Sequence, residues 1–340
     1  MDLFADLIAC PACGGRLTGL RCEACAAPYA EEDGILRLRA PADARTETVR
    51  EFYEAAPFPG YPPRDSLAWL RARAERSQFA QLLDQAIAGD ARIVEVGCGT
   101  GQMSLYLARA DRVVVGADLT LGSLRLAEAA RRRFGLPRVR FVESDLNRPG
   151  LTEGAFDVVY CSGVLHHTPD PQAAFARVAR LARPGGMIVL GLYNSVARLP
   201  LRLRRVAARL SGYRWIPFDP ILRDRANEPA RREAWLRDQY RHPEEHRHTV
   251  GEVLRWFRAS EVEFVRAYPS AQVHDEAPND LFAAEPDAWP PERWLAQIGW
   301  MASLGGEGGL FVMVGRRRAA PDQPSAVKQQ RDRLSAAALA

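Results

Sequence analysis

The sequence predicts an α/β fold with a mostly parallel sheet, preceded by a small cysteine-rich module. Three observations lead to this prediction. Between residues 92 and 193, short apolar runs typical of buried parallel strands alternate with helical patterns. The first of these runs leads directly into a glycine-rich turn, and four of the six cysteines lie at positions 10 to 25. The chain has 340 residues, more than the ~100–200 typical of one domain, so it has room for both modules.

The composition excludes several classes of protein. A hydrophobic fraction of 47% fits a globular chain and not a disordered one. No apolar run approaches the ~18–20 residues that cross a bilayer. The first residues, Met1 to Asp6, include acids where a signal peptide carries positive charge. We therefore expect a cytoplasmic protein with no membrane insertion.

Arginine dominates the basic residues, since only Lys328 is a lysine among the 46. Because arginine replaces lysine everywhere, a general bias of composition explains this better than nucleic-acid binding does. The distribution is nevertheless uneven. Residues 196–260 hold 15 arginines against 8 acidic residues, a net charge of +7. This concentration marks the region in which the substrate should be sought.

The early cysteines form two CxxC turns, with Cys10 and Cys13 in the first and Cys22 and Cys25 in the second. Each turn presents two thiolates from one tight knuckle, and together they supply the four soft ligands of a tetrahedral zinc ion. A redox pair explains one CxxC turn but not its duplicate. We therefore expect a closed, structural zinc site in residues 1–40.

The cysteine-rich module is similar to the small zinc-ribbon proteins that act as activators of certain methyltransferases. The resemblance covers about residues 7–38 and includes the ending Tyr29 to Leu38. Whether the ribbon also docks a partner stays open.

A glycine turn follows the strand predicted over residues 92–96. The turn reads Gly97-Cys98-Gly99-Thr100-Gly101 and is followed by a helical pattern over 102–110, an arrangement in which a ligand approaches backbone amides. It departs from the dinucleotide pattern at Gln102, and no P-loop Lys-Ser/Thr pair is present. Glu95 lies where a carboxylate would attract a cationic group. These details favour a cofactor with a positively charged amino-acid moiety over one with a pyrophosphate.

Polar residues also follow the later strands of this pattern. Asp118 ends the second strand, where an acid suits hydrogen bonds to ribose hydroxyls. Asp145 follows the third strand and is placed to accept a hydrogen bond from an adenine amino group. The fourth strand, over 156–161, opens into Ser162 and the pair His166-His167.

Together these motifs closely resemble the class I S-adenosylmethionine (SAM)-dependent methyltransferases, in the subgroup that includes ubiquinone-biosynthesis and small-molecule enzymes. The matching motifs are Val94 to Gly101, Asp118, Asp145-Leu146, Phe156 to Val159 and Arg183-Pro184-Gly185-Gly186. The resemblance covers about residues 92–193. It implies a Rossmann-like class I methyltransferase fold, with a mostly parallel seven-stranded sheet whose last strand is antiparallel.

The resemblance also implies which residues hold the cofactor. Gly97, Gly99 and Gly101 would line the methionine moiety, Asp118 the ribose, and Asp145 with Leu146 the adenine. Glu95 would contact the amino group or brace the loop. The expected cofactor-binding set is completed by Cys98, Leu119 and Ser162.

The expected division of the chain leaves long segments around this core. It comprises a zinc ribbon (1–40), a connector with lid helices (41–91), the SAM-binding core (92–194), a helical substrate-side insertion with late core elements (195–308), a final strand (309–315) and a disordered tail (316–340). In the connector, Tyr53 or Tyr61 either packs on the core or covers the cofactor, and residues 67–87 read as a helix. In the insertion we expect a basic amphipathic helix over 198–210, a helix over 250–257 opened by a capping box at Thr249, and a strand over 261–265.

Four residues are candidates for catalysis: His166, His167, Tyr240 and His242. Methyl transfer is an in-line displacement in which the enzyme aligns the acceptor with the methyl group, and a neutral imidazole could remove an acceptor proton. Alternatives stay open for the segment around His242. It could form a polar wall of the pocket, a solvated turn, or, with His246, His248 and His274, a second metal site.

The sequence thus favours a SAM-dependent methyltransferase that acts on a small molecule or biosynthetic intermediate. The alternative is an RNA or protein methyltransferase that docks its substrate on the zinc ribbon and the basic insertion. A third reading is a SAM-binding protein without catalysis. The acceptor, the acceptor atom and the oligomeric state do not follow from these residues.

Overall fold

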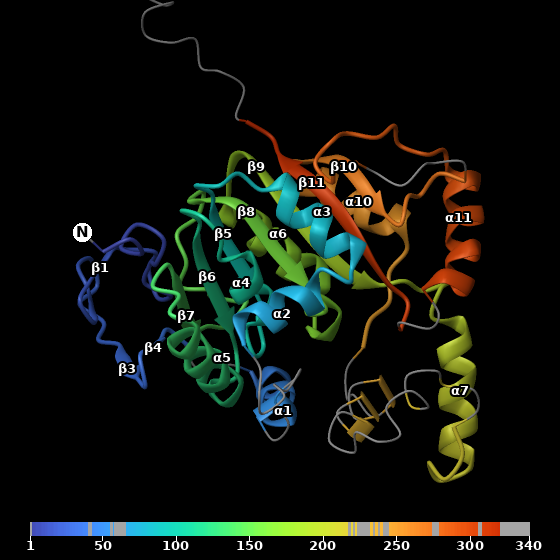
Figure 1. Cartoon of the computed structure of the whole chain (residues 1–340), viewed down its shortest axis with the longest axis horizontal. Helices are drawn as coiled ribbons and strands as arrows, with labels where there is room; N and C mark the ends of the chain where they lie inside the picture. The colour runs from blue at the N-terminus through green and yellow to red at the C-terminus, as the bar shows by residue number, and fades with distance from the viewer. Residues whose placement is uncertain are drawn as a thin grey trace, which may run out of the picture.

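A computed structural model describes residues 2–39, 43–54, 57, 66–216, 219, 222, 232–233, 235–236, 239–240, 245–273, 279–304 and 308–319 (Figure 1). Its elements in chain order are β1 (Leu17–Thr18), β2 (Arg21–Cys22), β3 (Ala30–Glu32), β4 (Ile35–Arg37), α1 (Ala44–Glu54), α2 (Leu67–Ala74), α3 (Gln78–Ala86), β5 (Arg92–Val96), α4 (Gln102–Leu107), β6 (Val113–Asp118), α5 (Leu121–Phe134), β7 (Val139–Glu143), β8 (Phe156–Ser162), η1 (Leu165–His167), α6 (Pro171–Leu181), β9 (Ala182–Tyr193), α7 (Leu199–Leu210), α10 (Val250–Ala259), β10 (Val262–Tyr268), α11 (Pro290–Ser303) and β11 (Leu310–Arg317). Within the described residues, no helix is long and apolar enough to cross a membrane.

One sheet runs through the molecule in the strand order β10-β11-β9-β8-β5-β6-β7-β4-β3. The strands from β9 to β4 in this order pair parallel to one another. In contrast, β11 pairs antiparallel with both β9 and β10. The predicted α/β fold with a mostly parallel sheet and an antiparallel last strand is confirmed.

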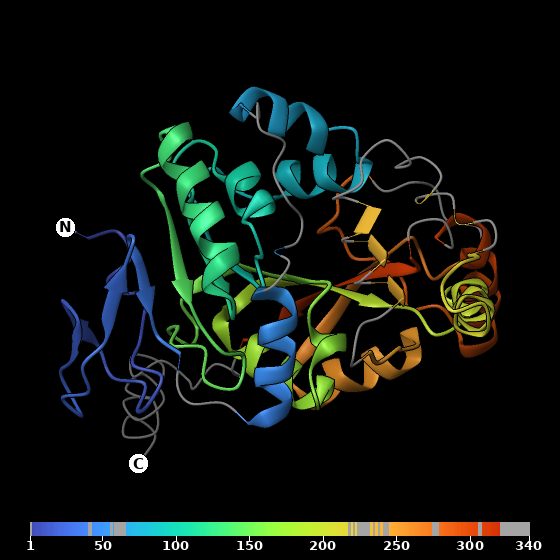
Figure 2. The same cartoon turned by 90° about the horizontal axis from the view of Figure 1, so that it is seen from below.

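The sheet has nine strands, two more than the seven predicted, because the cysteine-rich module contributes a hairpin to it. β4 pairs parallel with β7, and β3 pairs antiparallel with β4. The Leu38 amide extends this junction by donating to the Glu143 carbonyl at 2.8 Å. The extra strands were missed because segments of three residues carry no clear strand pattern. The module therefore continues the core sheet at one end of the molecule (Figures 1 and 2).

Helices cover both faces of the sheet (Figure 2). On one face, Leu105 of α4 and Leu124 of α5 join one buried cluster. On the other face, Phe175 of α6 and Phe257 of α10 belong to a second cluster and stack at 5.2 Å between ring centroids. Each strand of the core is therefore buried on both sides, which explains its continuous apolar sequence.

Several element bounds differ from those predicted, for local physical reasons. The single helix expected over 67–87 is two helices, because the Ser77 hydroxyl accepts from the Ala80 amide at 3.5 Å and starts α3 there. β10 continues to Tyr268 and β11 to Arg317, since their mutual pairing extends past the apolar residues that marked each strand. The predicted cap of α10 is present, with the Thr249 hydroxyl accepting from the Glu252 amide at 3.2 Å.

The apolar side of α7 faces solvent, contrary to the usual orientation of an amphipathic helix. Leu203 is 67% exposed and Leu210 is 85% exposed. The opposite side, with Leu201 and Ala208, is buried against a small satellite cluster. Some sequence predictions fall outside the described residues. These are Tyr61, His242, His274 and the part of the predicted tail that follows residue 319.

Candidate active site

A cavity of about 790 Å³ lies at the carboxyl ends of the parallel strands. This is the edge at which ligands bind in open α/β sheets. Its walls come from the ends of β5, β6, β8 and β9, from the loop after β7, and from α1 and α2. The sequence-predicted residues that line it are Tyr53, Glu95, Gly97, Cys98, Gly99, Asp118, Leu119, Asp145, Leu146, Ser162 and His167.

The glycine turn lies against this cavity, and two of its glycines have no room for a side chain. Gly97 has φ +72°, and a Cβ built there would lie 2.2 Å from Cγ2 of Val164. At Gly101, with φ +73°, a Cβ would lie 2.6 Å from Cζ of Phe141. Gly101 does not line the cavity. It starts α4 in a left-handed conformation, so its role is to turn the chain.

Glu95 is hydrogen-bonded to the first turn of α4, the helix that follows the glycine turn. Its Oε2 accepts hydrogen bonds from the Ser104 amide, at 2.7 Å, and from the Ser104 hydroxyl. Burial raises the pKa of the Glu95 carboxyl to about 8, although the hydrogen bonds from Ser104 oppose the change. Glu95 thus contacts the start of α4 and also lines the cavity, and both roles expected for it, contact with a cationic group and bracing of the loop, stay predictions.

Asp118 is held rigidly at the end of β6. Its Oδ2 accepts from the Gly99 amide at 2.7 Å. Its Oδ1 accepts from the amide and the hydroxyl of Thr120, at 2.9 and 2.7 Å. Burial raises the pKa of this carboxyl against the effect of these donors. The arrangement presents a fixed acceptor beside the glycine turn, which suits a diol such as ribose.

Asp145 and Leu146 lie in the loop after β7. Oδ1 of Asp145 accepts from the Asn147 amide at 2.8 Å, which fixes the carboxyl group in the cavity wall. The cysteine-rich module holds the far end of this loop. The Ala9 amide donates to the Gly150 carbonyl, and the Thr152 amide donates to the Leu7 carbonyl, both at 3.0 Å. The module thus supports the part of the cavity expected to take an adenine.

Aromatic rings surround the end of the cavity beyond Ser162. The His167 ring lies 6.3 Å from that of Tyr53 and 5.9 Å from that of Tyr193, between centroids. Gln239 donates to the Tyr193 hydroxyl at 2.7 Å. Trp235 and Gln239 also line this end. The sequence analysis missed Tyr193, Trp235 and Gln239, although the position of Tyr193 at the carboxyl end of β9 was a usable signal.

Two other catalytic candidates, His166 and Tyr240, lie outside the cavity lining. His166 is buried behind the wall, with its ring stacked on Tyr193 at 3.8 Å, and does not line the cavity. Tyr240 is also outside the lining, and its hydroxyl donates to Oδ2 of Asp219 at 2.6 Å. Burial and Asp219 raise the pKa of Tyr240 well above its usual range, which makes it a poor base at neutral pH. Of the described candidates, His167 alone faces the cavity.

A buried ion cluster supports the aromatic wall from behind. The Arg198 guanidinium lies 3.5 Å from the centroid of the Tyr193 ring and 2.8 Å from Oε2 of Glu245. Glu245 also accepts from Arg205, at 2.9 Å. Burial alone would raise the pKa of Glu245, but these two cations hold it below its usual range. Part of the positive charge of the insertion is therefore used inside the protein.

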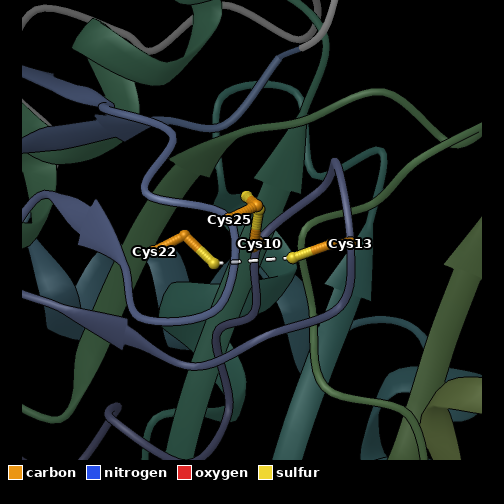
Figure 3. Close-up of side chains that lie close together, drawn as sticks. All are labelled: Cys10, Cys13, Cys22 and Cys25. Carbon is orange, nitrogen blue, oxygen red and sulfur yellow. Dashed lines mark hydrogen bonds between the residues drawn. The ribbon is translucent and has the colours of Figure 1, made fainter.

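The four early cysteines converge in the ribbon (Figure 3). The Sγ atoms of Cys10 and Cys25 are 3.6 Å apart, those of Cys13 and Cys22 are 3.5 Å apart, and all four lie within 4.8 Å of one another. A tetrahedral zinc ion with ~2.3 Å bonds to sulfur separates its ligands by about 3.8 Å. Over the described part of the chain, this is the one group of metal-ligating side chains found. His248 instead pairs with Glu252 at 3.0 Å.

Comparisons with known proteins agree with this arrangement. Residues 94–190 match a family model described as a methyltransferase domain. A ubiquinone biosynthesis O-methyltransferase of Paracidovorax citrulli is 34% identical over 32% of this chain and 45% of its own length. The ubiquinone biosynthesis O-methyltransferase of Methylococcus capsulatus is 37% identical over 35% of this chain and 49% of its own length. An uncharacterized protein of a Synechococcus strain is 28% identical over 74% of this chain and 63% of its own length. The chain thus spans less than two thirds of these relatives.

Solved structures similar to the chain include the [4+2]-cyclase SpnF, with a TM-score of 0.48, 17% identity, and coverage of 82% of this chain and 98% of that one. Magnesium protoporphyrin IX methyltransferase from Synechocystis, solved with bound SAM, has a TM-score of 0.46 and 14% identity. The match covers 82% of this chain and 100% of that one. With the family match, the glycine turn and the three acids at the ends of successive strands, residues 94–190 are a class I SAM-dependent methyltransferase domain.

Proposed function

We propose that the protein transfers the methyl group of SAM to a small-molecule acceptor. One observation carries this proposal: Glu95, Asp118 and Asp145 line a single cavity from three adjacent strand ends. The order of these acids matches the order of the ammonium, ribose and adenine groups along the cofactor. The three acidic side chains therefore fit the hydrogen-bond donors that SAM presents.

The residues of the chain would act mainly by orienting and enclosing the reactants. Bound SAM supplies an electrophilic methyl group on a sulfonium. An acceptor in the aromatic end would lie among Tyr53, His167, Tyr193 and Trp235, which exclude water and fix its direction of approach. His167 is the side chain we propose to take a proton from an oxygen or nitrogen acceptor.

Two arginines of the basic insertion are engaged inside the protein, which favours a small acceptor over RNA. Arg198 and Arg205, from the basic insertion, pair with Glu245 and do not face solvent as phosphate-binding side chains would. RNA binding should weaken steeply with salt. A filter-retention assay with tRNA and rRNA that finds salt-sensitive affinity would support the RNA alternative and count against this choice.

For the four cysteines we propose a structural zinc ion. Four protein ligands leave no open position for a substrate. Hydrogen bonding supports ligand character at Cys10, whose Sγ lies 2.8 Å from the Tyr29 hydroxyl. The ion would stabilise the ribbon, and through it the edge of the sheet at β7.

A crystal structure with S-adenosylhomocysteine tests the proposed function. We expect the ribose at Asp118, the adenine at Asp145 and the sulfur facing the end of the cavity that holds His167 and Tyr193. A product bound with its sulfur pointing away from this end would contradict the assignment of the acceptor site.

A further inference from the structure

The outer side of α7 carries a continuous apolar surface, which we call the α7 stripe: Leu199, Leu203, Val206 and Leu210. These side chains are 43%, 67%, 56% and 85% exposed, respectively. Their spacing of three or four residues puts them on one side of the helix. The side turned to the protein holds Leu201 and Ala208, at 3% and 0% exposure. The stripe is therefore directed away from the protein.

Positive charge flanks the α7 stripe. The helix contains Arg202, Arg204, Arg205 and Arg209 and no acidic residue. Arg205 pairs with Glu245, whereas the exposed Arg202 and Arg209 have no ion-pair partner within the described part of the chain. An apolar ridge bordered by unpaired arginines complements a surface that is anionic at its face and apolar beneath.

Exposed tryptophans lie in the same part of the molecule. Trp215, just after α7, is 59% exposed. On α11, Trp294 is 53% exposed and Ile298 is 49% exposed. In both views α7 and α11 lie at the same end of the molecule, opposite the cysteine-rich module (Figures 1 and 2). Tryptophan is favoured at the boundary between lipid and water.

From these observations we propose that α7 docks the protein on an anionic membrane surface, lying in the plane of the interface with the stripe among the acyl chains. Such helices combine an apolar side with basic flanks. The stripe is a ridge and not a groove, since Leu210 projects almost fully into solvent. A nucleic acid would leave the stripe without a partner. This docking is independent of the methyl transfer proposed above.

Vesicle co-sedimentation tests the proposal with the whole 340-residue chain, purified with zinc in the buffer. The probes are vesicles of phosphatidylcholine alone and of phosphatidylcholine with phosphatidylserine. The wild-type protein should sediment with the anionic vesicles, and less so as salt is added. The variant Leu203→Ser/Leu210→Ser should lose binding by at least ~10-fold, since each leucine contributes apolar burial. Arg202→Gln/Arg209→Gln should weaken binding to anionic vesicles by roughly fivefold per arginine and leave binding to neutral vesicles unchanged.

Leu126→Ser is the matched control, because Leu126 is 42% exposed on α5, away from the stripe. It should bind vesicles as the wild type does. The proposal is overturned if the wild type does not bind anionic vesicles, or if the folded stripe variant binds them equally well. It is also overturned if light scattering finds a wild-type dimer that the stripe variant converts to a monomer, since a second copy would then cover the stripe.

Discussion

Replacing Glu95 by glutamine tests the electrostatics beneath the glycine turn. The carboxyl is buried, and its pKa is raised from 4.5 to about 8. The folded state therefore binds this proton more tightly than the unfolded state does, so the free energy of unfolding falls as pH rises from about 4.5 to about 8. At ~1.4 kcal/mol per pH unit, the ionised Glu95 carboxylate lowers the free energy of unfolding by on the order of 5 kcal/mol above pH 8. Glutamine carries no charge and keeps an oxygen that can accept from Ser104.

The assay is urea unfolding followed by circular dichroism at pH 5.5 and pH 8.5. Without cofactor, we expect Glu95→Gln to be more stable than the wild type at pH 8.5, with a much smaller difference at pH 5.5. Glu128→Gln is the control, because Glu128 is equally buried but pairs with Arg131 and Arg132. It should be less stable than the wild type at both values. If Glu95→Gln and the wild type differ in free energy of unfolding by the same amount at both pH values, the reasoning about Glu95 is wrong.

Three further predictions concern the cofactor, the metal and the turn. Asp118→Ala should weaken SAM binding by ~10- to 100-fold in calorimetry, because the fixed acceptor for the ribose is lost; an unchanged dissociation constant would contradict this. Cys10→Ser and Cys22→Ser should lose zinc by elemental analysis and melt at lower temperature, while SAM affinity changes far less than in Asp118→Ala; full zinc content in both would refute the assignment. Gly97→Ala should lower stability by ~1–3 kcal/mol or more in thermal unfolding, since its Cβ would meet Val164 at 2.2 Å; a wild-type melting temperature would count against the described packing.

The core was predictable because its signals are local. The strand of residues 92–96, the glycine turn and the acids at strand ends are each read from a few neighbouring residues. Asp118 and Asp145 follow apolar runs, and parallel strands bring such ends to one edge of a sheet. The paired CxxC turns are equally local, and the four cysteines converge as expected.

The features that were missed depend on contacts between distant parts of the chain. The pairing of β4 with β7 joins residues about a hundred positions apart, and nothing within the three residues of β4 specifies that partner. Tyr193 and Gln239 meet across 46 positions. Tyr240 had a suitable residue type for catalysis, but its hydroxyl is bonded to Asp219, and neither residue lines the cavity. The apolar residues of α7 were recognised in the sequence, but the pattern does not show that this apolar side of the helix faces solvent.

Equilibrium binding of S-adenosylhomocysteine to the 340-residue chain, purified with zinc in the buffer, tests the central claim most directly. Isothermal titration calorimetry should find one site per chain in the wild type and strongly reduced affinity in Asp118→Ala. Absence of binding by the folded wild-type protein would contradict the assignment of the cavity to SAM, and with it the proposed methyl transfer.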